Sequence, residues 1–268
     1  MNKGFLWFAQ NNNSTDYTSL SIELAKSIKK YNKENQICVI TDRNTVFNSE
    51  YIDKIIILNN DNSANDQIKF GNEYKAFALS PFTHTIKLEA DMLFSDNVDW
   101  WWNHLCQHDL VFALNCRNYR DEIVSNTPYR RLFRQNHLPN LYNGLTYFRR
   151  SKKAMEFFNL CKDITENWQR VKEQLLINCH DLHPTTDVVY ALAYRIMDPL
   201  QQHLINYSWF KFIHGKPAVN DILHAQEQYN YLNPMKIEDR IYLGGRRLSR
   251  IWHYHDKKMI DTLNERTF

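Results

Sequence analysis

The feature that most constrains this chain is a regular alternation of short apolar runs and amphipathic segments in its first third. Apolar runs with the length of buried β-strands occupy residues 4–9, 37–41, 52–58 and 85–90. Residues 17–32 carry apolar side chains at helical spacing behind a possible N-cap at Thr15 or Asp16, and 72–80 forms a second helix. This alternation predicts an α/β fold with a mixed, mostly parallel, Rossmann-like sheet flanked by helices.

The rest of the chain continues the pattern less regularly. Further strands are expected at 110–115 and 142–148, and further helices at 100–108, 151–168 and 185–197. Residues 116–140 are expected to form a long, basic, irregular insertion. No linker divides the chain, which predicts a single domain over 1–268 that ends in a basic segment, 239–268.

The composition is that of a soluble globular protein, with 43% hydrophobic and 24% charged residues. The five cysteines are an odd number without close pairing, which fits reduced thiols and predicts a cytoplasmic protein, in the host cytoplasm if a phage encodes it. No apolar run reaches the length of about 18 residues that a membrane span needs, so no membrane partner is expected. The oligomeric state is left open.

The net charge of +3 hides an uneven distribution. Residues 115–153 hold nine Lys and Arg against two acids, which gives +7, and residues 239–258 hold six against two, which gives +4. The remaining chain therefore carries 3 − 7 − 4 = −8. Two basic segments on an acidic body suggest an anionic partner such as a nucleotide or a polyanion. The alternative is that folding disperses these residues as ordinary surface charges.

An acidic pair ends the strand expected at 85–90. Glu89 and Asp91 are two residues apart, so on an extended strand their side chains point the same way. Carboxylate oxygens are ligands for Mg²⁺ or Mn²⁺, and such ions bridge carboxylates to substrate phosphates. The pair therefore indicates a phosphate-handling metal site at the carboxyl edge of the sheet, unless it is only a solvated turn.

In this setting the segment Lys75–Phe82, followed by Lys87–Leu93, resembles the GT-A glycosyltransferases. In that fold a helix carrying Lys or Arg precedes a strand that ends in Asp-x-Asp, and Glu89 stands here at the first Asp. The resemblance implies that Asp91 binds the metal, that Glu89 contacts the metal or the donor ribose, and that Lys75 lies near the leaving phosphate. The opening of the chain also looks like that of phage-encoded glycosyltransferase-like proteins.

Two later segments resemble the sugar and acceptor side of the same family. The Asn143-Gly144 pair in 142–149 is similar to the family's Asn-Gly segment, where glycine lets the backbone approach a ligand; the alternative is a hairpin turn. Asp187 resembles the family's acid at the start of a late helix, which would hold acceptor hydroxyls or act as a base. Its alternative is a helix N-cap.

The segment 212–217 resembles the His-x-Gly-x-x-Lys-Pro segment of retaining members, shortened by two residues. The resemblance implies that His214 is the third metal ligand and that Lys216 contacts the diphosphate. His253 and His255 are rival sources of that ligand.

The resemblance implies a glycosyltransferase that uses Mn²⁺ or Mg²⁺ and a nucleotide-sugar donor, with UDP expected as the nucleotide. The donor nucleoside would contact Phe8, Ala9, Gln10, Asp16 and Asp42, with Gly144 beside the sugar. The preferred acceptor is 5-hydroxymethylcytosine in double-stranded phage DNA, held by basic residues of the two segments: Arg117, Arg120, Arg130, Arg131, Arg134, Arg246 and Arg247. The alternatives are a glycan or lipopolysaccharide acceptor, a non-catalytic nucleotide-sugar binder, and a metal-dependent nuclease.

Overall fold

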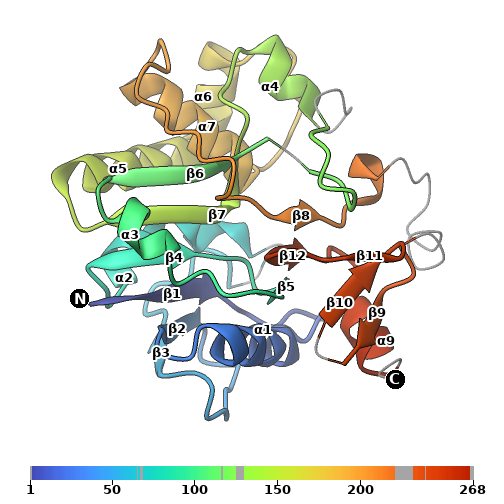
Figure 1. The fold of residues 1–268 in the computed structure, drawn as a ribbon. Helices are drawn as coiled ribbons and strands as arrows, with labels where there is room; N and C mark the ends of the chain where they lie inside the picture. The colour runs from blue at the N-terminus through green and yellow to red at the C-terminus, as the bar shows by residue number, and fades with distance from the viewer. Residues whose placement is uncertain are drawn as a thin grey trace.

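A six-stranded sheet forms the centre of the protein (Figure 1), for which the computed structural model describes residues 2–64, 66, 69–115, 117–124, 130–220, 232–238 and 240–265. The strand order is β3-β2-β1-β4-β7-β6. The strands are β1 (Lys3–Phe8), β2 (Gln36–Thr41), β3 (Lys54–Ile57), β4 (His84–Lys87), β6 (Leu110–Leu114) and β7 (Leu141–Arg149). The first four run parallel and β7 runs antiparallel to both of its neighbours, so the sheet is mixed but mostly parallel, as predicted.

The chain order switches direction between β1 and β4. The sheet grows from β1 through β2 to β3 on one side, and the chain then returns to add β4 on the other side of β1. Crevices at such switch points, outside the carboxyl ends of the strands, are where α/β sheets bind ligands. Here those two ends lead into Ala9-Gln10 and into Leu88-Glu89.

Helices cover both faces of this sheet (Figure 1) because its central strands alternate between two cores. Phe5 and Trp7 of β1 pack on the α1 side, whereas Leu6 packs on the α5 and α7 side. The main helices are α1 (Tyr17–Tyr31), α3 (Trp101–Leu105), α5 (Lys152–Glu166), α6 (Trp168–Leu175) and α7 (Thr186–Met197). Shorter ones are η1 (Phe70–Lys75), α2 (Ala76–Leu79), α4 (Arg131–Gln135) and η3 (Pro217–Val219).

The end of the chain returns to the carboxyl edge of the central sheet. Strand β12 (Ile251–His253) pairs with β5 (Met92–Phe94), which directly follows the acidic pair, and with β8 (Ile213–His214). A second small sheet contains β9 (Met235–Ile237), β10 (Arg240–Leu243) and β11 (Arg246–Arg247), and α9 (Met259–Glu265) lies beside it (Figure 1). Three segments distant in sequence thus meet next to Asp91.

The structure confirms most predicted elements, excludes the hairpin alternative for Gly144 and corrects the expected insertion. The N-cap of α1 is Asp16, whose carboxylate accepts hydrogen bonds from Thr18 N and Ser19 N. Gly144 lies inside the nine-residue strand β7 and not in a hairpin turn. The expected insertion 116–140 contains α4, so its described part is not wholly irregular, while Cys116 and 125–129 lie outside the described residues.

The cysteines and the helix lengths can be compared with the expectations from the sequence. The cysteines Cys38, Cys106, Cys161 and Cys179 are free thiols. Within the described ranges, no helix is both long enough and apolar enough to cross a membrane.

Candidate active site

A cavity of about 520 Å³, the main cavity, opens at the carboxyl ends of β1 and β4. Residues of β7, β8 and β12, of η1 and α4 and of the start of α7 also line it. Eleven of the residues expected in a site line it: Phe8, Gln10, Glu89, Asp91, Asn143, Gly144, Asp187, His214, Lys216, His253 and His255. The cavity therefore gathers residues from most of the chain length at the sheet edge where a ligand was expected.

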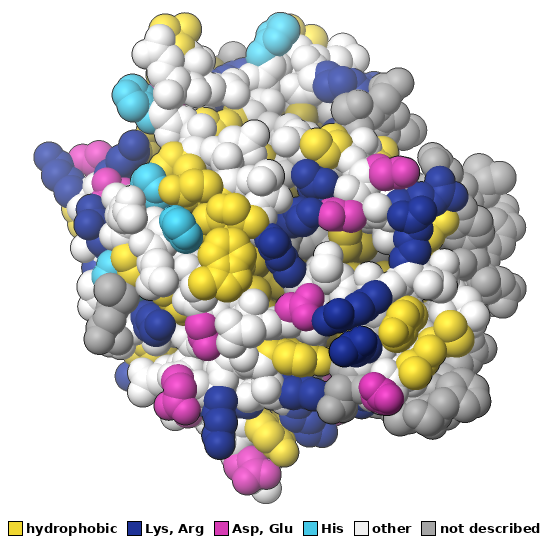
Figure 2. All heavy atoms as spheres, viewed as in Figure 1, with side chains coloured by type: hydrophobic (Ala, Val, Ile, Leu, Met, Phe, Trp, Pro, Cys, Tyr) yellow, Lys and Arg dark blue, Asp and Glu magenta, His cyan; other side chains and the backbone are white. Residues whose placement is uncertain are grey.

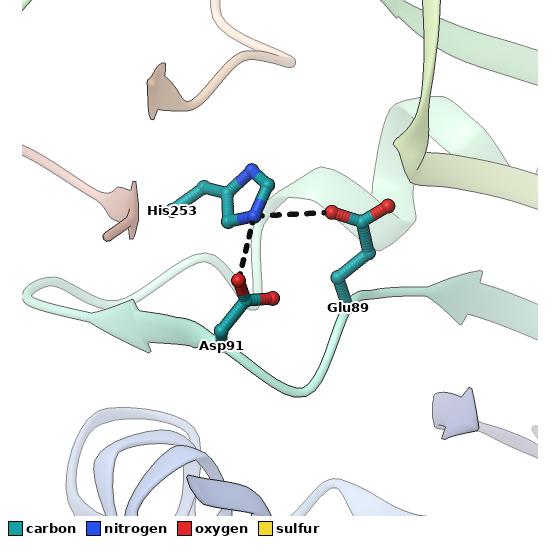
Figure 3. A group of neighbouring side chains, drawn as sticks. All are labelled: Glu89, Asp91 and His253. Carbon is teal, nitrogen blue, oxygen red and sulfur yellow. Dashed lines mark hydrogen bonds and ion pairs between the residues drawn. The ribbon is translucent and has the colours of Figure 1, made fainter. Parts of the chain in front are cut away.

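Glu89, Asp91 and His253 form a compact cluster (Figure 3), and all three line the main cavity. His253 Nε2 lies 2.9 Å from Asp91 Oδ2 and 3.2 Å from Glu89 Oε2. The ammonium group of Lys257 also contacts Asp91 Oδ2. The backbone fixes this arrangement, because Tyr254 N donates a hydrogen bond of 3.1 Å to Asp91 O. The structure thus brings His253, and not His214, to the two carboxylates.

The charges in the cluster shift one another's proton affinities. Burial would raise the pKa of Asp91, but the positive charges of His253 and Lys257 outweigh burial and hold that pKa well below its usual value. Burial raises the pKa of Glu89, against the attraction of His253. Burial would lower the pKa of His253, but Asp91 and Glu89 raise it overall. Asp91 is therefore the firmly ionised member of the pair.

The cluster suits a hard divalent cation. One ligand atom from each of Glu89, Asp91 and His253 lies within 4.8 Å of the other two. Two carboxylate oxygens and one imidazole nitrogen form a donor set that accepts Mn²⁺ or Mg²⁺, the oxygens serving either ion. All three residues line the main cavity, so a cation held by them would be next to the space that a substrate would occupy.

Gly144 makes room for Glu89. The pairing of β7 with β6 shifts register: Ala113 pairs with Tyr142, whereas Phe112 pairs with Thr146. Residues 143–145 of β7 therefore have no partner on β6. A Cβ atom on Gly144 would lie 3.0 Å from Glu89 Cδ and 3.1 Å from its Oε2. A side chain at this position would therefore have to displace the Glu89 carboxylate by a few tenths of an ångström.

Asp187 joins three elements instead of capping its helix. Its Oδ1 accepts a hydrogen bond of 2.8 Å from Asn143 N, and its Oδ2 accepts one of 2.9 Å from Arg130. Arg130 also donates to the Tyr142 hydroxyl at 2.8 Å, and its guanidinium lies 3.5 Å from the centre of that ring. These bonds hold β7 in position at the cavity, where the side-chain amide nitrogen of Asn143 is buried without a hydrogen-bond partner among the described residues.

His214 lies behind His253. The two rings are stacked with centroids 4.7 Å apart and an angle of 14° between their planes. Burial, together with the positive charge of His253, holds the pKa of His214 well below its usual value, so this ring is neutral. Burial also lowers the pKa of His255 to about 4. Neither ring belongs to the three-residue cluster, although both line the main cavity.

The residues expected to hold the donor nucleoside fall into two groups. Phe8 and Gln10 line the main cavity, whereas Ala9, Asp16, Asp42 and Lys75 are not among its lining residues. Asp42 accepts hydrogen bonds from Gln10 and from Thr45 N, which orients Gln10. Lys75 donates to Asn60 O and to the side-chain oxygens of Asn62 and Asn72, so its ammonium group ties a loop to η1.

The arginines expected to contact an acceptor are not equivalent. Arg130 is only 2% exposed and points inward to Asp187. Arg117 binds Asp121, Arg247 binds Asp96, and Arg120 donates to the Tyr119 hydroxyl. Arg131, Arg134 and Arg246 are exposed. Figure 2 shows Lys and Arg in several separate groups on one face, with acidic side chains beside them.

Sequence reasoning missed several residues of the main cavity, notably Tyr17, Glu73, Tyr142 and Lys257. The signal for Lys257 was its place four residues after His253, in a segment already named as a source of metal ligands. Tyr17 follows the N-cap of α1, and Lys257 Nζ lies 5.9 Å from the centre of its ring. Glu73 carried no such signal in the sequence. The structure places it on the cavity wall, where it forms an ion pair of 2.5 Å with Lys87.

Comparison with known proteins supports the fold. No model of a protein family and no curated protein sequence matches the chain. Among solved structures, the chain is similar to mouse xyloside xylosyltransferase 1 in its apo form, with a TM-score of 0.54 and 8% sequence identity over 96% of this chain and 98% of that one. At this identity the likeness concerns the fold, which is shared over nearly the whole length of both proteins.

Proposed function

We propose that this protein is a metal-dependent glycosyltransferase that moves a sugar from a nucleotide sugar to an acceptor hydroxyl. The observation that carries the proposal is the Glu89–Asp91–His253 cluster, which lines a cavity at the sheet's switch point. The fold similarity to a xylosyltransferase supports it. We expect UDP as the nucleotide and Mn²⁺ or Mg²⁺ as the ion.

The residues of the main cavity divide into two groups by chemistry. Phe8, Gln10 and Tyr17 lie where the nucleoside would bind, at the end of β1 and the start of α1. Lys216 and Lys257 supply positive charge for the diphosphate. A cation held by Asp91, Glu89 and His253 would stabilise the negative charge that develops on the leaving phosphate.

Asn143 and Glu73 would surround the transferred sugar. In the transfer, the acceptor oxygen bonds to the anomeric carbon and loses its proton to the departing phosphate or to water, while the bond from carbon to phosphate oxygen breaks. The side-chain amide nitrogen of Asn143, which has no hydrogen-bond partner among the described residues, would donate to a sugar hydroxyl. Asp187 positions Asn143 through the backbone, so its effect on the sugar is indirect.

Two alternatives have less support. A nuclease commonly gathers carboxylates around two metal ions, whereas the described residues contain one group of three possible ligands. The 5-hydroxymethylcytosine acceptor depended on the basic segments, and Arg130, Arg117 and Arg247 are engaged with acidic side chains. We therefore favour a saccharide acceptor over phage DNA.

The binding half of the proposal can be tested by thermal unfolding of the protein with a panel of nucleotide sugars, with and without Mn²⁺. A ligand at 100 times its Kd stabilises the folded state by about 2.7 kcal/mol, which is an increase in Tm of roughly 5–10 °C for a chain of this length. We expect such an increase with one nucleotide sugar only when Mn²⁺ is present.

The matched control is a pair of variants. Asp91→Asn should abolish the Mn²⁺-dependent increase, whereas Asp109→Asn should retain it, because Asp109 pairs with Arg149 away from the main cavity. An increase that survives Asp91→Asn, or no increase with any nucleotide sugar, would count against the proposal.

A further inference from the structure

A second cavity of about 500 Å³ adjoins the main cavity. Residues of η1, α5 and α7 and of the 183–184 segment line it. The two cavities share Phe70, Glu73 and Thr186 as lining residues. A ligand in the second cavity would therefore lie next to the transferred sugar, which is proposed to bind beside Asn143 and Glu73 in the main cavity.

The second cavity has the wrong charge for an anionic ligand. Asp66, Glu73 and Glu166 line it, and none of its described lining residues is Lys or Arg. Lys87 approaches Glu73 at 2.5 Å, but its side chain is completely buried and is not part of the lining. A nucleic acid or a sulfated glycan would thus bring negative charge toward carboxylates without a lining cation to receive it.

The same lining suits an uncharged molecule with many hydroxyls. Phe70 and Tyr74 provide aromatic surface, and Phe70 is 47% exposed. Carboxylates and the Asn62 amide provide hydrogen-bond acceptors beside these rings. Sugars combine apolar C–H faces with hydroxyl donors, so both kinds of surface would be used.

Tyr190 gives an independent indication of a polar ligand. It is 1% exposed, and its hydroxyl has no hydrogen-bond partner among the described residues. Buried hydroxyls are normally hydrogen-bonded, because leaving one unpaired costs free energy. Tyr194, one turn later on α7, has a partner in Asp198 at 3.3 Å. Because Tyr190 is one of the lining residues of the second cavity, a ligand hydroxyl bound there would supply the missing partner.

We propose that the second cavity binds an uncharged saccharide, the acceptor end of the substrate, and presents it to the main cavity past Phe70, Glu73 and Thr186. This inference rests on the proposed glycosyl transfer for the acceptor role. The binding of the saccharide itself is independent of metal and nucleotide.

Saturation-transfer NMR with lactose, cellobiose and maltose, on the protein without nucleotide, tests the inference. At least one disaccharide should bind to the wild type. Binding to Tyr190→Phe, which removes one hydrogen bond, should be about fivefold weaker, and binding to Phe70→Ala should be undetectable. Tyr194→Phe, the matched control, should bind as the wild type does, since Tyr194 lines neither cavity. Asp91→Asn should also bind saccharide normally.

The outcomes separate this inference from the proposed function. If no disaccharide binds while nucleotide sugar and Mn²⁺ still raise the Tm of the protein, the inference is overturned and the proposed function stands. Binding that is unchanged in both Phe70→Ala and Tyr190→Phe would place the saccharide elsewhere and also overturn it. Displacement of the disaccharide by a short DNA duplex would favour a polyanionic acceptor and contradict the charge argument.

Discussion

At the scale of single residues, the cluster around Asp91 balances its own charges before any ion binds. Two carboxylates face the imidazole of His253 and the ammonium group of Lys257. A bound divalent cation would neutralise the two carboxylates in place of these two positive side chains. It must therefore compete with a proton on His253 and with the contact from Lys257 to Asp91.

This competition predicts a pH dependence of metal binding. Asp91 and Glu89 raise the pKa of His253, against burial, so its proton persists to a higher pH than on an ordinary histidine. Metal binding requires the neutral ring, so below that pKa the Mn²⁺ affinity should fall about tenfold per pH unit. Mn²⁺ titrations followed by electron paramagnetic resonance should show this slope, and an affinity that is independent of pH would exclude His253 as a ligand.

Gly144 offers a test that leaves every proposed ligand in place. In Gly144→Ala the new Cβ would lie 3.0 Å from Glu89 Cδ, so the carboxylate must move. We expect the Mn²⁺ affinity to fall roughly tenfold, as for other residues that orient a ligand. The same titration measures it, with the Tm as a control for folding. An unchanged affinity would mean that Glu89 does not bind the ion.

At the scale of elements, Arg130 connects α4, α7 and β7. It stands at the N-cap of α4, stacks on Tyr142 of β7 and binds Asp187 in the first turn of α7. Arg130 was expected among the acceptor-binding arginines, because charge and spacing do not distinguish a buried arginine from an exposed one. Its partner Asp187 is 57 residues away, so no local pattern links them.

The connection predicts unequal effects of two neighbouring substitutions. Arg130→Met leaves the partly buried carboxylate of Asp187 without its ion-pair partner and should lower the free energy of unfolding by about 3 kcal/mol. Arg131→Met, on the exposed side of α4, should change it by less than about 0.5 kcal/mol. Urea denaturation measures both. Equal effects would contradict the structural role of Arg130.

The same scale explains which elements the sequence could predict. The helix α1 and the strands β1 and β2 carry strong periodicity or continuous apolar runs, and their predicted bounds agree with the structure to within two residues. Strands β5, β8 and β12 have two or three residues each, too few for any periodicity. They form through pairing with distant segments, which a single sequence does not reveal.

At the scale of the whole molecule, the candidate site depends on the return of the chain end to the first half. His253 and Asp91 are 162 residues apart and meet because β12 pairs with β5. The acidic pair was predictable from its place at a strand end. The choice among His214, His253 and His255 was not, since all three follow or end short strands near the same edge.

The most direct test of the account is the release of free nucleoside diphosphate from the nucleotide sugar selected by thermal unfolding, with Mn²⁺ and a disaccharide acceptor. We predict release by the wild type and by Asp109→Asn, and none by Asp91→Asn or without metal. Binding of the nucleotide sugar without any release by the wild type would contradict catalysis and leave a protein that only binds the donor.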